Sequence, residues 1–503
     1  MKWITRIAMA AVLAAALASG TSAKTLRIGL AEDPDLLDPT LARTFVGRIV
    51  FASLCDKLFD ISPDLKVVPQ LATGYEWSAD NKALTLKLRQ GVVFQDGEPF
   101  NAEAVKFSIE RHLTLQGSTR KSEINAIQSI DVLDERTVRL NLAKPFAPLL
   151  AALTDRAGMI VSPKAAKEEG KDFALHPVCA GPFKFVERVA QDRIVLEKFD
   201  KYWNKDNVHI DRIEYRPIID NAVRVANLQS GSLDLIERVA PTDLPALRKD
   251  PKLQTAEISS LAYQGITINI ANGPKAQNPL GQDPRVREAF DLAIDRGAIP
   301  QVVFNGEFTP GNQWDPVGNP YYVKEFPVHA RNLEKAKALL KEAGHPDLVV
   351  NLMVPTTQED QQGAQVLQAM VKEAGIDMRI QSVEFATSLD RAHRGDFEAW
   401  YIGWSGRTDP DGNLYSFVAC KAPLNDGNYC NPEVDKALEE SRSTNDPAAR
   451  YQAYKKAAEI LIEKDRPIIY LFQRKWIYGM TKALAGFTPY PDGLVRVVGV
   501  DLK

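Results

Sequence analysis

The residue types that most often perform catalysis are present in this 503-residue chain, but their spacing matches no common catalytic centre. No Gly-x-Ser-x-Gly motif is present to hold a serine nucleophile, and Gly170-Lys171 is followed by Asp172, not by the Ser or Thr of a phosphate-binding loop. None of the six histidines forms the spaced pair typical of a metal site: His112, His176, His209, His329, His345 and His393. Catalytic groups often come from distant positions, so a secreted hydrolase stays an alternative. We nevertheless predict a protein that is not an enzyme and needs no metal and no cofactor.

Four cysteines are the remaining reactive side chains, and in an exported protein they indicate disulfides. Cys420 and Cys430 bracket a short segment with the turn signal Asn425-Asp426-Gly427, so we predict that they are bonded. Cys55 and Cys179 are then either bonded to each other or two buried thiols. Their separation in sequence does not decide between these alternatives, and we favour the second disulfide.

The first residues have the pattern of a secretory signal peptide. Lys2 and Arg6 precede an apolar, alanine-rich run, and the small residues Thr21-Ser22-Ala23 follow it. A membrane anchor is the alternative, but spanning a bilayer takes about 20 apolar residues and this run has only about a dozen. We predict a signal peptide over residues 1–23, cleaved after Ala23, and a free exported protein.

Composition limits the partners of the chain. It is 45% hydrophobic and 25% charged, with a formal net charge of −3. Nucleic acid and acidic membrane surfaces are poor partners for such a chain. Its length suits two or three lobes better than one core.

Strand and helix signals alternate along the whole length. Residues 24–31 read as a strand, and leucines at 84, 86 and 88 and apolar residues at 138, 140 and 142 alternate as in half-buried antiparallel strands. Helix starts are signalled by capping residues followed by apolar positions at helical spacing, at Asn101, Asp283, Asn332 and Asp446. This interleaving predicts α/β lobes and neither a helical bundle nor a sandwich.

Several motifs resemble, in order and over nearly the whole chain, those of a known family. The densest runs from Leu84 to Arg111 and contains Phe94-Gln-Asp-Gly-Glu-Pro-Phe100; further matches are Ser53–Leu58, Val68–Ala72, His176–Phe183, Tyr202-Trp203, Leu228–Asp234 and Arg285–Arg296. The chain therefore resembles the bacterial extracellular solute-binding proteins of family 5, the dipeptide-, oligopeptide- and nickel-binding type.

The resemblance implies a two-lobed periplasmic binding protein fold, type II and cluster C, with an extra subdomain in the large lobe. In this numbering we expect the large lobe over 24–266, its extra subdomain over about 48–172, the second lobe over 267–481 and a return to the large lobe over 482–503. It also implies a monomer that captures a small solute between the lobes and delivers it to the permease and ATPase subunits of an ABC importer.

The resemblance also points to a ligand site and to one departure from the family pattern. Peptide binders have a tryptophan followed by two small residues and an aspartate that holds the ligand ammonium; here Trp404 matches, but Arg407 takes the aspartate position. A guanidinium cannot hold an ammonium but suits a carboxylate. We therefore predict a peptide-like, opine-like or other amino-acid-derived solute with a carboxylate at Arg407, with Asp409 and Asp411 nearby. The alternative is that Arg407 pairs internally with Asp409 or Asp411.

Weaker similarity suggests four further lining residues: Asp33, Tyr263, Phe472 and Arg156. Of these, Phe472 is the one most easily explained as core. A carrier of a metal chelate such as nickel is the alternative binding function, and it would favour a histidine near Trp404, where none is present.

Overall fold

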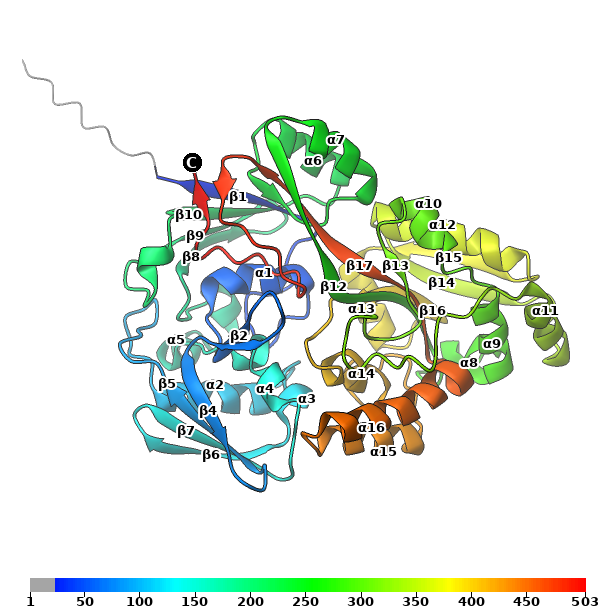
Figure 1. Ribbon diagram of the computed structural model, residues 1–503, viewed down its shortest axis with the longest axis horizontal. Helices are drawn as coiled ribbons and strands as arrows, with labels where there is room; N and C mark the ends of the chain where they lie inside the picture. Colours follow the sequence, from blue (N-terminus) through cyan, green and yellow to red (C-terminus); the bar gives the residue numbers. More distant parts are fainter. Residues whose placement is uncertain (1–22) are drawn as a thin grey trace, which may run out of the picture.

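A computed structural model describes residues 23–503 of the protein, so the predicted signal peptide lies outside the described residues except for Ala23. Its largest element is a mixed sheet that runs through most of the molecule (Figure 1). In spatial order its strands are β15 (Asp377–Val383), β14 (Val349–Pro355), β16 (Ala399–Trp404), β12 (Leu253–Ile268), β17 (Ile468–Thr481), β11 (Leu235–Ile236), β1 (Thr25–Leu30), β10 (Arg212–Pro217), β9 (Arg193–Lys198) and β8 (Phe183–Val189), and the short β13 (Thr309–Pro310) pairs with β17.

A separate four-stranded antiparallel sheet forms the lower left part of Figure 1, in the order β4 (Ala72–Trp77), β5 (Ala83–Leu88), β7 (Thr137–Leu142) and β6 (Ile127–Asp134). The alternating apolar residues predicted to form strands pair as expected, with Leu84 opposite Leu140 and Leu86 opposite Val138. These side chains are fully buried in a core of their own. Two smaller pairs complete the strands: β2 (Phe59–Ile61) with β3 (Val67–Pro69), and β18 (Leu484–Ala485) with β19 (Asp501–Leu502).

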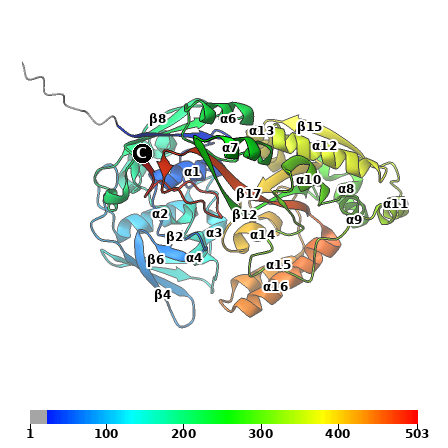
Figure 2. The ribbon, with the colours of Figure 1, turned by 45° about the horizontal axis from the view of Figure 1, so that its top comes forward.

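Helices cover the sheets on several sides, and Figure 2 shows them from a second direction. In the first half of the chain they are α1 (Phe45–Leu54), α2 (Ala102–Thr114), α3 (Lys121–Ile124), α4 (Leu149–Ala152), α5 (Pro163–Glu169), α6 (Asn221–Gln229) and α7 (Leu244–Lys249). In the second half they are α8 (Pro279–Gln282), α9 (Pro284–Leu292), α10 (Ala298–Phe304), α11 (Leu333–Glu342), α12 (Gln358–Lys372), α13 (Phe385–His393), α14 (Asp411–Val418), α15 (Pro432–Arg442) and α16 (Pro447–Ile460).

The predicted capping residues begin helices as expected. The side chain of Asn101 accepts a hydrogen bond from the amide of Ala104, and Asp283, Asn332 and Asp446 cap α9, α11 and α16 in the same way. Each cap satisfies an amide that the first helical turn leaves without a partner. The mixed α/β prediction is therefore confirmed.

The long strands β12 and β17 connect the two halves of the molecule. They pair with each other over almost their whole length, with a register shift between Ser259 and Tyr263 (Figure 1). Beyond the shift, β12 contributes Ile266 and Ile268 to the apolar core of the second half, whereas Ala262 belongs to that of the first. A register shift weakens the ladder locally, so this is the place where the paired strands can bend most easily.

Both cysteine pairs are bonded in the structure. Cys420 is joined to Cys430, and Cys55 to Cys179, with Cα atoms 4.5 and 4.9 Å apart. The second bond links the end of α1 to the segment before β8. Among the described residues, no helix is both long and apolar enough to cross a membrane.

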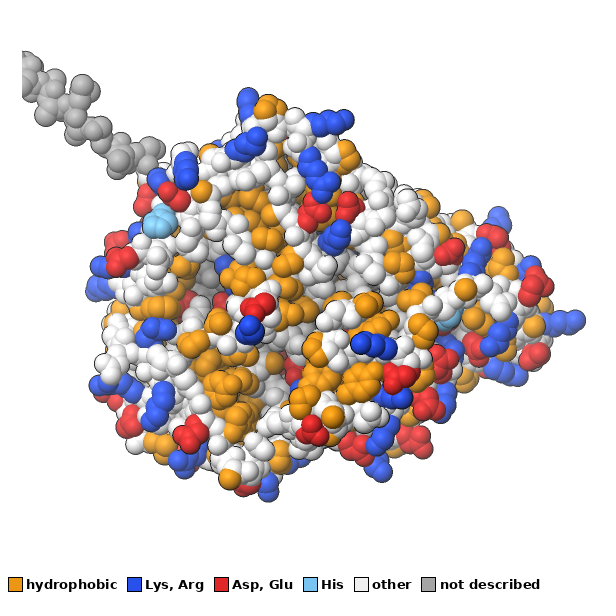
Figure 3. Space-filling view, viewed as in Figure 1, with side chains coloured by type: hydrophobic (Ala, Val, Ile, Leu, Met, Phe, Trp, Pro, Cys, Tyr) orange, Lys and Arg blue, Asp and Glu red, His pale blue; other side chains and the backbone are white. Residues whose placement is uncertain are grey.

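Charged side chains are spread around the outside of the molecule, whereas apolar side chains gather near the centre of the face in Figure 3. The central part of the molecule is where segments from the two halves of the chain meet, and Trp404 and Arg407 lie there.

Candidate ligand-binding site

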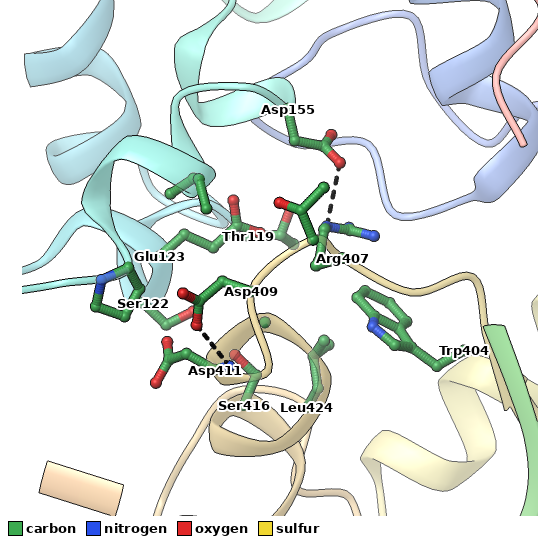
Figure 4. Close-up of a pocket in the computed structure, with 15 residues that line it drawn as sticks. Thr119, Ser122, Glu123, Asp155, Trp404, Arg407, Asp409, Asp411, Ser416 and Leu424 are labelled. Atoms are coloured by element: carbon green, nitrogen blue, oxygen red, sulfur yellow. Dashed lines mark hydrogen bonds and ion pairs between the residues drawn. The ribbon is translucent and has the colours of Figure 1, made fainter. Parts of the chain in front are cut away.

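Trp404 is the last residue of β16, and the sheet fixes its position by pairing it with Tyr263 of β12. The chain then turns sharply at Gly406, which has a φ of +81°. A Cβ at this position would lie 2.3 Å from the carbonyl oxygen of Leu261, so only glycine fits. This turn directs Arg407 away from the sheet and towards the first half of the molecule (Figure 4).

Asn413, fully buried in α14, holds Trp404 and Arg407 in place. Its side-chain oxygen accepts hydrogen bonds from the indole N–H of Trp404 at 3.1 Å and the backbone amide of Arg407 at 2.6 Å. Its amide group donates to Asp315 at 2.7 Å. The indole and the start of the following loop are therefore oriented before any ligand arrives.

Trp404 lines three adjoining cavities of about 580, 580 and 910 Å³, which we call the Trp404 cleft. One wall comes from the first half of the chain, in segments 43–45, 119–123 and 148–156, and the other from residues 385–426. Clefts of this size, partly apolar and with a few polar groups, are typical of small-molecule sites.

Asp155 lies at the centre of the charged groups in this cleft. Arg407 approaches it across the cleft, with Nε 3.1 Å from Oδ2 (Figure 4). Arg48, from the same half of the chain as Asp155, donates to its other oxygen at 3.2 Å and also reaches the hydroxyl of Ser405 at 3.2 Å. The two halves of the molecule are thus joined at this point by the Arg407–Asp155 ion pair and by the charge-assisted hydrogen bond from Arg48 to Ser405.

The surrounding guanidiniums outnumber the carboxylates. Arg48, Arg120, Arg156 and Arg407 lie together, and among the described residues the carboxylates that pair with them are Asp155 and Glu123. Burial alone would raise the pKa of Asp155, but Arg407, Arg48 and Arg156 hold it well below its usual value. Burial, followed by repulsion from Arg48, lowers the pKa of Arg407 to about 10 despite the attraction of Asp155. These shifts indicate cations that are incompletely neutralised.

Two buried donors in this cluster have no hydrogen-bond partner among the described residues: Nη2 of Arg407, and Nε of Arg156, which lies 3.7 Å from Oδ1 of Asp155. Arg156 is only 1% exposed and lines the 910 Å³ cavity of the Trp404 cleft, while its Nη1 donates to the carbonyl of Ala42 at 2.6 Å. An unpaired buried donor is costly. An anionic group in the cleft would therefore find two donors ready to bind it.

The alternative prediction, that Arg407 pairs internally with Asp409 or Asp411, is wrong. Asp409 forms a two-pronged ion pair with Arg450, and Asp411 does the same with Arg442. Both carboxylates line the cleft, but each is already paired with an arginine, Arg450 of α16 or Arg442 of α15. Arg407 pairs with Asp155 instead, because the turn at Gly406 sends it across the cleft.

The remaining predicted residues divide into two groups. Tyr263 and Arg156 line the cleft, and the ring of Tyr263 lies edge-on to Tyr470 with centroids 4.9 Å apart. Asp33 and Phe472 are not among the lining residues. Asp33 is 3.2 Å from Arg188, and Phe472 is buried against Phe304 and Phe308 as a core residue.

The sequence alone did not indicate Asp155, Arg48 or Arg120. They lie about 250 to 360 positions before Arg407, and no motif that we considered includes them. Within residues 23–503 no cluster of His, Cys, Asp and Glu side chains has the arrangement of a metal site.

Comparisons with known proteins agree with this architecture. Residues 66–425 match the family model described as bacterial extracellular solute-binding proteins, family 5 Middle. The glutathione-binding protein GsiB of Salmonella typhi is 31% identical over 515 aligned residues, covering 100% of this chain and 99% of the relative. GsiB of Pectobacterium atrosepticum is 30% identical, with 98% and 97% coverage.

Solved structures show the same fold. The binding protein AgaA from A. tumefaciens R10 in complex with agropinic acid has a TM-score of 0.86 and 29% identity, covering 95% of this chain and 99% of AgaA. NikA from Staphylococcus aureus in complex with Ni(L-His)2 has a TM-score of 0.85 at 23% identity, covering 95% and 100%, a likeness in fold only. The predicted two-lobed type II fold is confirmed.

Proposed function

We propose that this chain, which belongs to the bacterial extracellular solute-binding proteins of family 5, captures an amino-acid-derived solute through a carboxylate held at Arg407 and Arg156. Relatives in this family are periplasmic binding proteins of ABC transporters, which bind and release solutes without converting them, and the chain is not an enzyme.

The excess of guanidinium groups around Trp404 is the observation on which this proposal rests. Arg156 and Arg407 each have a buried donor without a hydrogen-bond partner among the described residues, and Asp155 and Glu123 do not neutralise all four arginines. A carboxylate of the ligand would accept from both donors, and in a closed, dry cleft such bonds are strong. The face of Trp404 offers a stacking surface beside them.

The relatives support the ligand class. GsiB is named for glutathione, and AgaA was solved with agropinic acid. Glutathione and agropinic acid are amino-acid derivatives with carboxyl groups. Both relatives align over essentially the whole chain. We propose a solute of this kind, peptide-like or opine-like, for the present protein.

The wider system follows from the family. We propose that the mature protein begins after Ala23, works in the periplasm as a monomer and delivers its solute to separate permease and ATPase subunits. The lobes are proposed at 24–266 with 482–503, and 267–481, with the extra subdomain at about 48–172. The strands β12 and β17 that join the two halves would form the hinge between them.

Titration calorimetry with glutathione and with its C-terminal amide tests the proposed contact. We expect Arg407→Ala to weaken glutathione binding by well over tenfold, since truncating one member of a buried charge pair costs about 2–5 kcal/mol. The same variant should weaken the binding of the amide analogue much less. Arg379→Ala, which removes an exposed arginine at the edge of β15, is the control.

If Arg407 served only to join the lobes through Asp155, the variant would weaken the acid and the amide equally. That result would remove Arg407 from the ligand contacts. Failure of glutathione, agropinic acid and short peptides alike to bind the wild type would reject the ligand class.

A further inference from the structure

The Trp404 cleft continues past the indole to a second group of charged residues, in which carboxylates outnumber guanidiniums. There the cavity is lined by Glu32, Asp360, Arg238, Arg474 and Gln264, beside the stacked rings of Phe45 and Trp476. The acidic and basic groups that interact here are Glu32, Glu237, Glu359 and Asp360 with Arg224, Arg238 and Arg474. This end has one more carboxylate than guanidinium, whereas the Arg407 end has two more guanidiniums than carboxylates.

Among these carboxylates, Asp360 is the one whose negative charge is least compensated by nearby guanidiniums. Its Oδ2 accepts from the hydroxyl of Thr357 at 2.6 Å, but its nearest cation, Arg474, is 3.4 Å from Oδ1. Arg474 is directed mainly to Glu359 at 2.9 Å and to Gln264 at 2.7 Å. Asp360 therefore lies at the cleft with one oxygen that a second cation could approach.

Tyr401 supplies an independent sign of a missing ligand group. It is fully buried, lines the same cavity, and its hydroxyl has no hydrogen-bond partner in the part of the chain that the structure describes. It interacts electrostatically with Asp360. Burial raises the pKa of Asp360 above its usual value although Arg474 and Thr357 lower it, which is consistent with a carboxylate that lacks a full counter-charge.

We propose that Asp360 and Tyr401 bind a primary ammonium group of the solute, at the opposite end of the cleft from the Arg156 and Arg407 carboxylate site. This deepens the proposed function and rests on it, since it assigns a second end to the same ligand. The family position that holds an ammonium in peptide binders is taken here by Arg407, so the amine site has moved to the other side of Trp404. The solute then carries an ammonium group at one end and a carboxylate at the other.

The experiment compares glutathione, which has that charge pattern, with N-acetylglutathione, in which the amine is blocked, by titration calorimetry on four proteins. In the wild type we expect acetylation to weaken binding at least about tenfold, as for losing a hydrogen-bonded charged group. In Asp360→Asn the two probes should differ by less than about threefold. Glu373→Gln, an exposed carboxylate at the end of the same helix, should behave like the wild type.

Tyr401→Phe is the second variant, because removing a hydroxyl without a partner should not harm folding. It should keep or raise the melting temperature and weaken glutathione several-fold while leaving the acetylated probe unchanged. An equal acetylation penalty in the wild type and Asp360→Asn would overturn the amine site and leave the carboxylate proposal standing. Failure of both probes to bind the wild type would overturn the amine site, and the carboxylate proposal would fall with it only if agropinic acid and short peptides also failed to bind.

Discussion

Asp155 is the residue on which the charges of the cleft depend most. It is 5% exposed and compensates Arg48 and Arg407, with the backbone amide of Arg156 as a further donor at 2.6 Å. We expect Asp155→Asn to lower the free energy of unfolding at pH 7 by about 3–5 kcal/mol, because buried guanidiniums lose their counter-charge. Urea denaturation measures this.

The same residue predicts a dependence on pH. Because the pKa of Asp155 is held well below its usual 3.8 in the folded state, its stabilisation is fully present above pH 3.8 and is lost as the pH falls towards the folded value. The difference in unfolding free energy between the wild type and Asp155→Asn should therefore be constant from pH 7 to about 5 and shrink below pH 4. A difference that stays constant down to pH 2 would contradict this account.

Asp315 should behave in the opposite way. It is fully buried, and burial together with the nearby Asp409 raises its pKa to about 7, although Asn413 donates to it. The folded state therefore holds the proton more tightly than the unfolded state, so stability falls between about pH 4 and 7 and then levels off. Asp315→Asn, which cannot ionise, should be more stable than the wild type by about 2–4 kcal/mol above pH 7.5 and equal to it at pH 4.

Thermal unfolding across this pH range tests the prediction, with Asp347→Asn, an exposed position, as the control. A gain of the same size at pH 4 would show that the effect does not come from ionisation. Asn413 links Asp315 to Trp404. A clear loss of ligand affinity in Asp315→Asn would therefore show that the indole has changed its orientation.

At the scale of elements, the sequence predicted the helices and strands well because their signals are local. A capping side chain such as Asn101 and the residues that it caps lie within one turn, and the alternation of Leu84, Leu86 and Leu88 reflects a single strand with one buried face. The predicted Cys420–Cys430 bond was equally local, since a turn lies between the two cysteines.

The site was predicted only in part because its charges come together through tertiary structure. Trp404 and Arg407 follow one strand, and the motif match was enough to select them. Asp155 reaches Arg407 only after the chain has formed a separate sheet and crossed between the halves, and nothing near either residue indicates the pairing. The wrong partners predicted for Arg407, Asp409 and Asp411, were its neighbours in sequence, which shows the limit of local reasoning.

The loop between α14 and α15 supplies a prediction at this scale. The Cys420–Cys430 bond closes it, and Leu424 and Asp426 within it line the cleft. We expect replacement of both cysteines by serine to lower the unfolding free energy by about 2–3 kcal/mol, the value for a loop of this length. Non-reducing peptide mapping of the wild type should find no free thiol at either position. Recovery of alkylated Cys420 or Cys430 without reduction would contradict the prediction.

At the scale of the whole molecule, the structure contains several contacts that can exist only when the two halves are close. The amide of Ala147 donates to the carbonyl of Arg442 at 2.8 Å, Lys144 pairs with Glu439, and Arg48 reaches Ser405. These contacts lie on the cleft side of the strands β12 and β17. We therefore infer that the structure is a closed form, in which opening would break these contacts together.

Closure should depend on ligand, because the polar contacts across the cleft are few and each exchanges hydrogen bonds with water for bonds within the protein. We expect small-angle scattering to give a larger radius of gyration without ligand than with saturating glutathione, as the register shift between Ser259 and Tyr263 lets the paired strands bend. Arg407→Ala, measured at a glutathione concentration that saturates it, should close less completely, since the contact to Asp155 is missing. Identical scattering curves for free and bound wild type, with binding proven by calorimetry, would mean that the protein is already closed and that the solute enters without movement of the lobes.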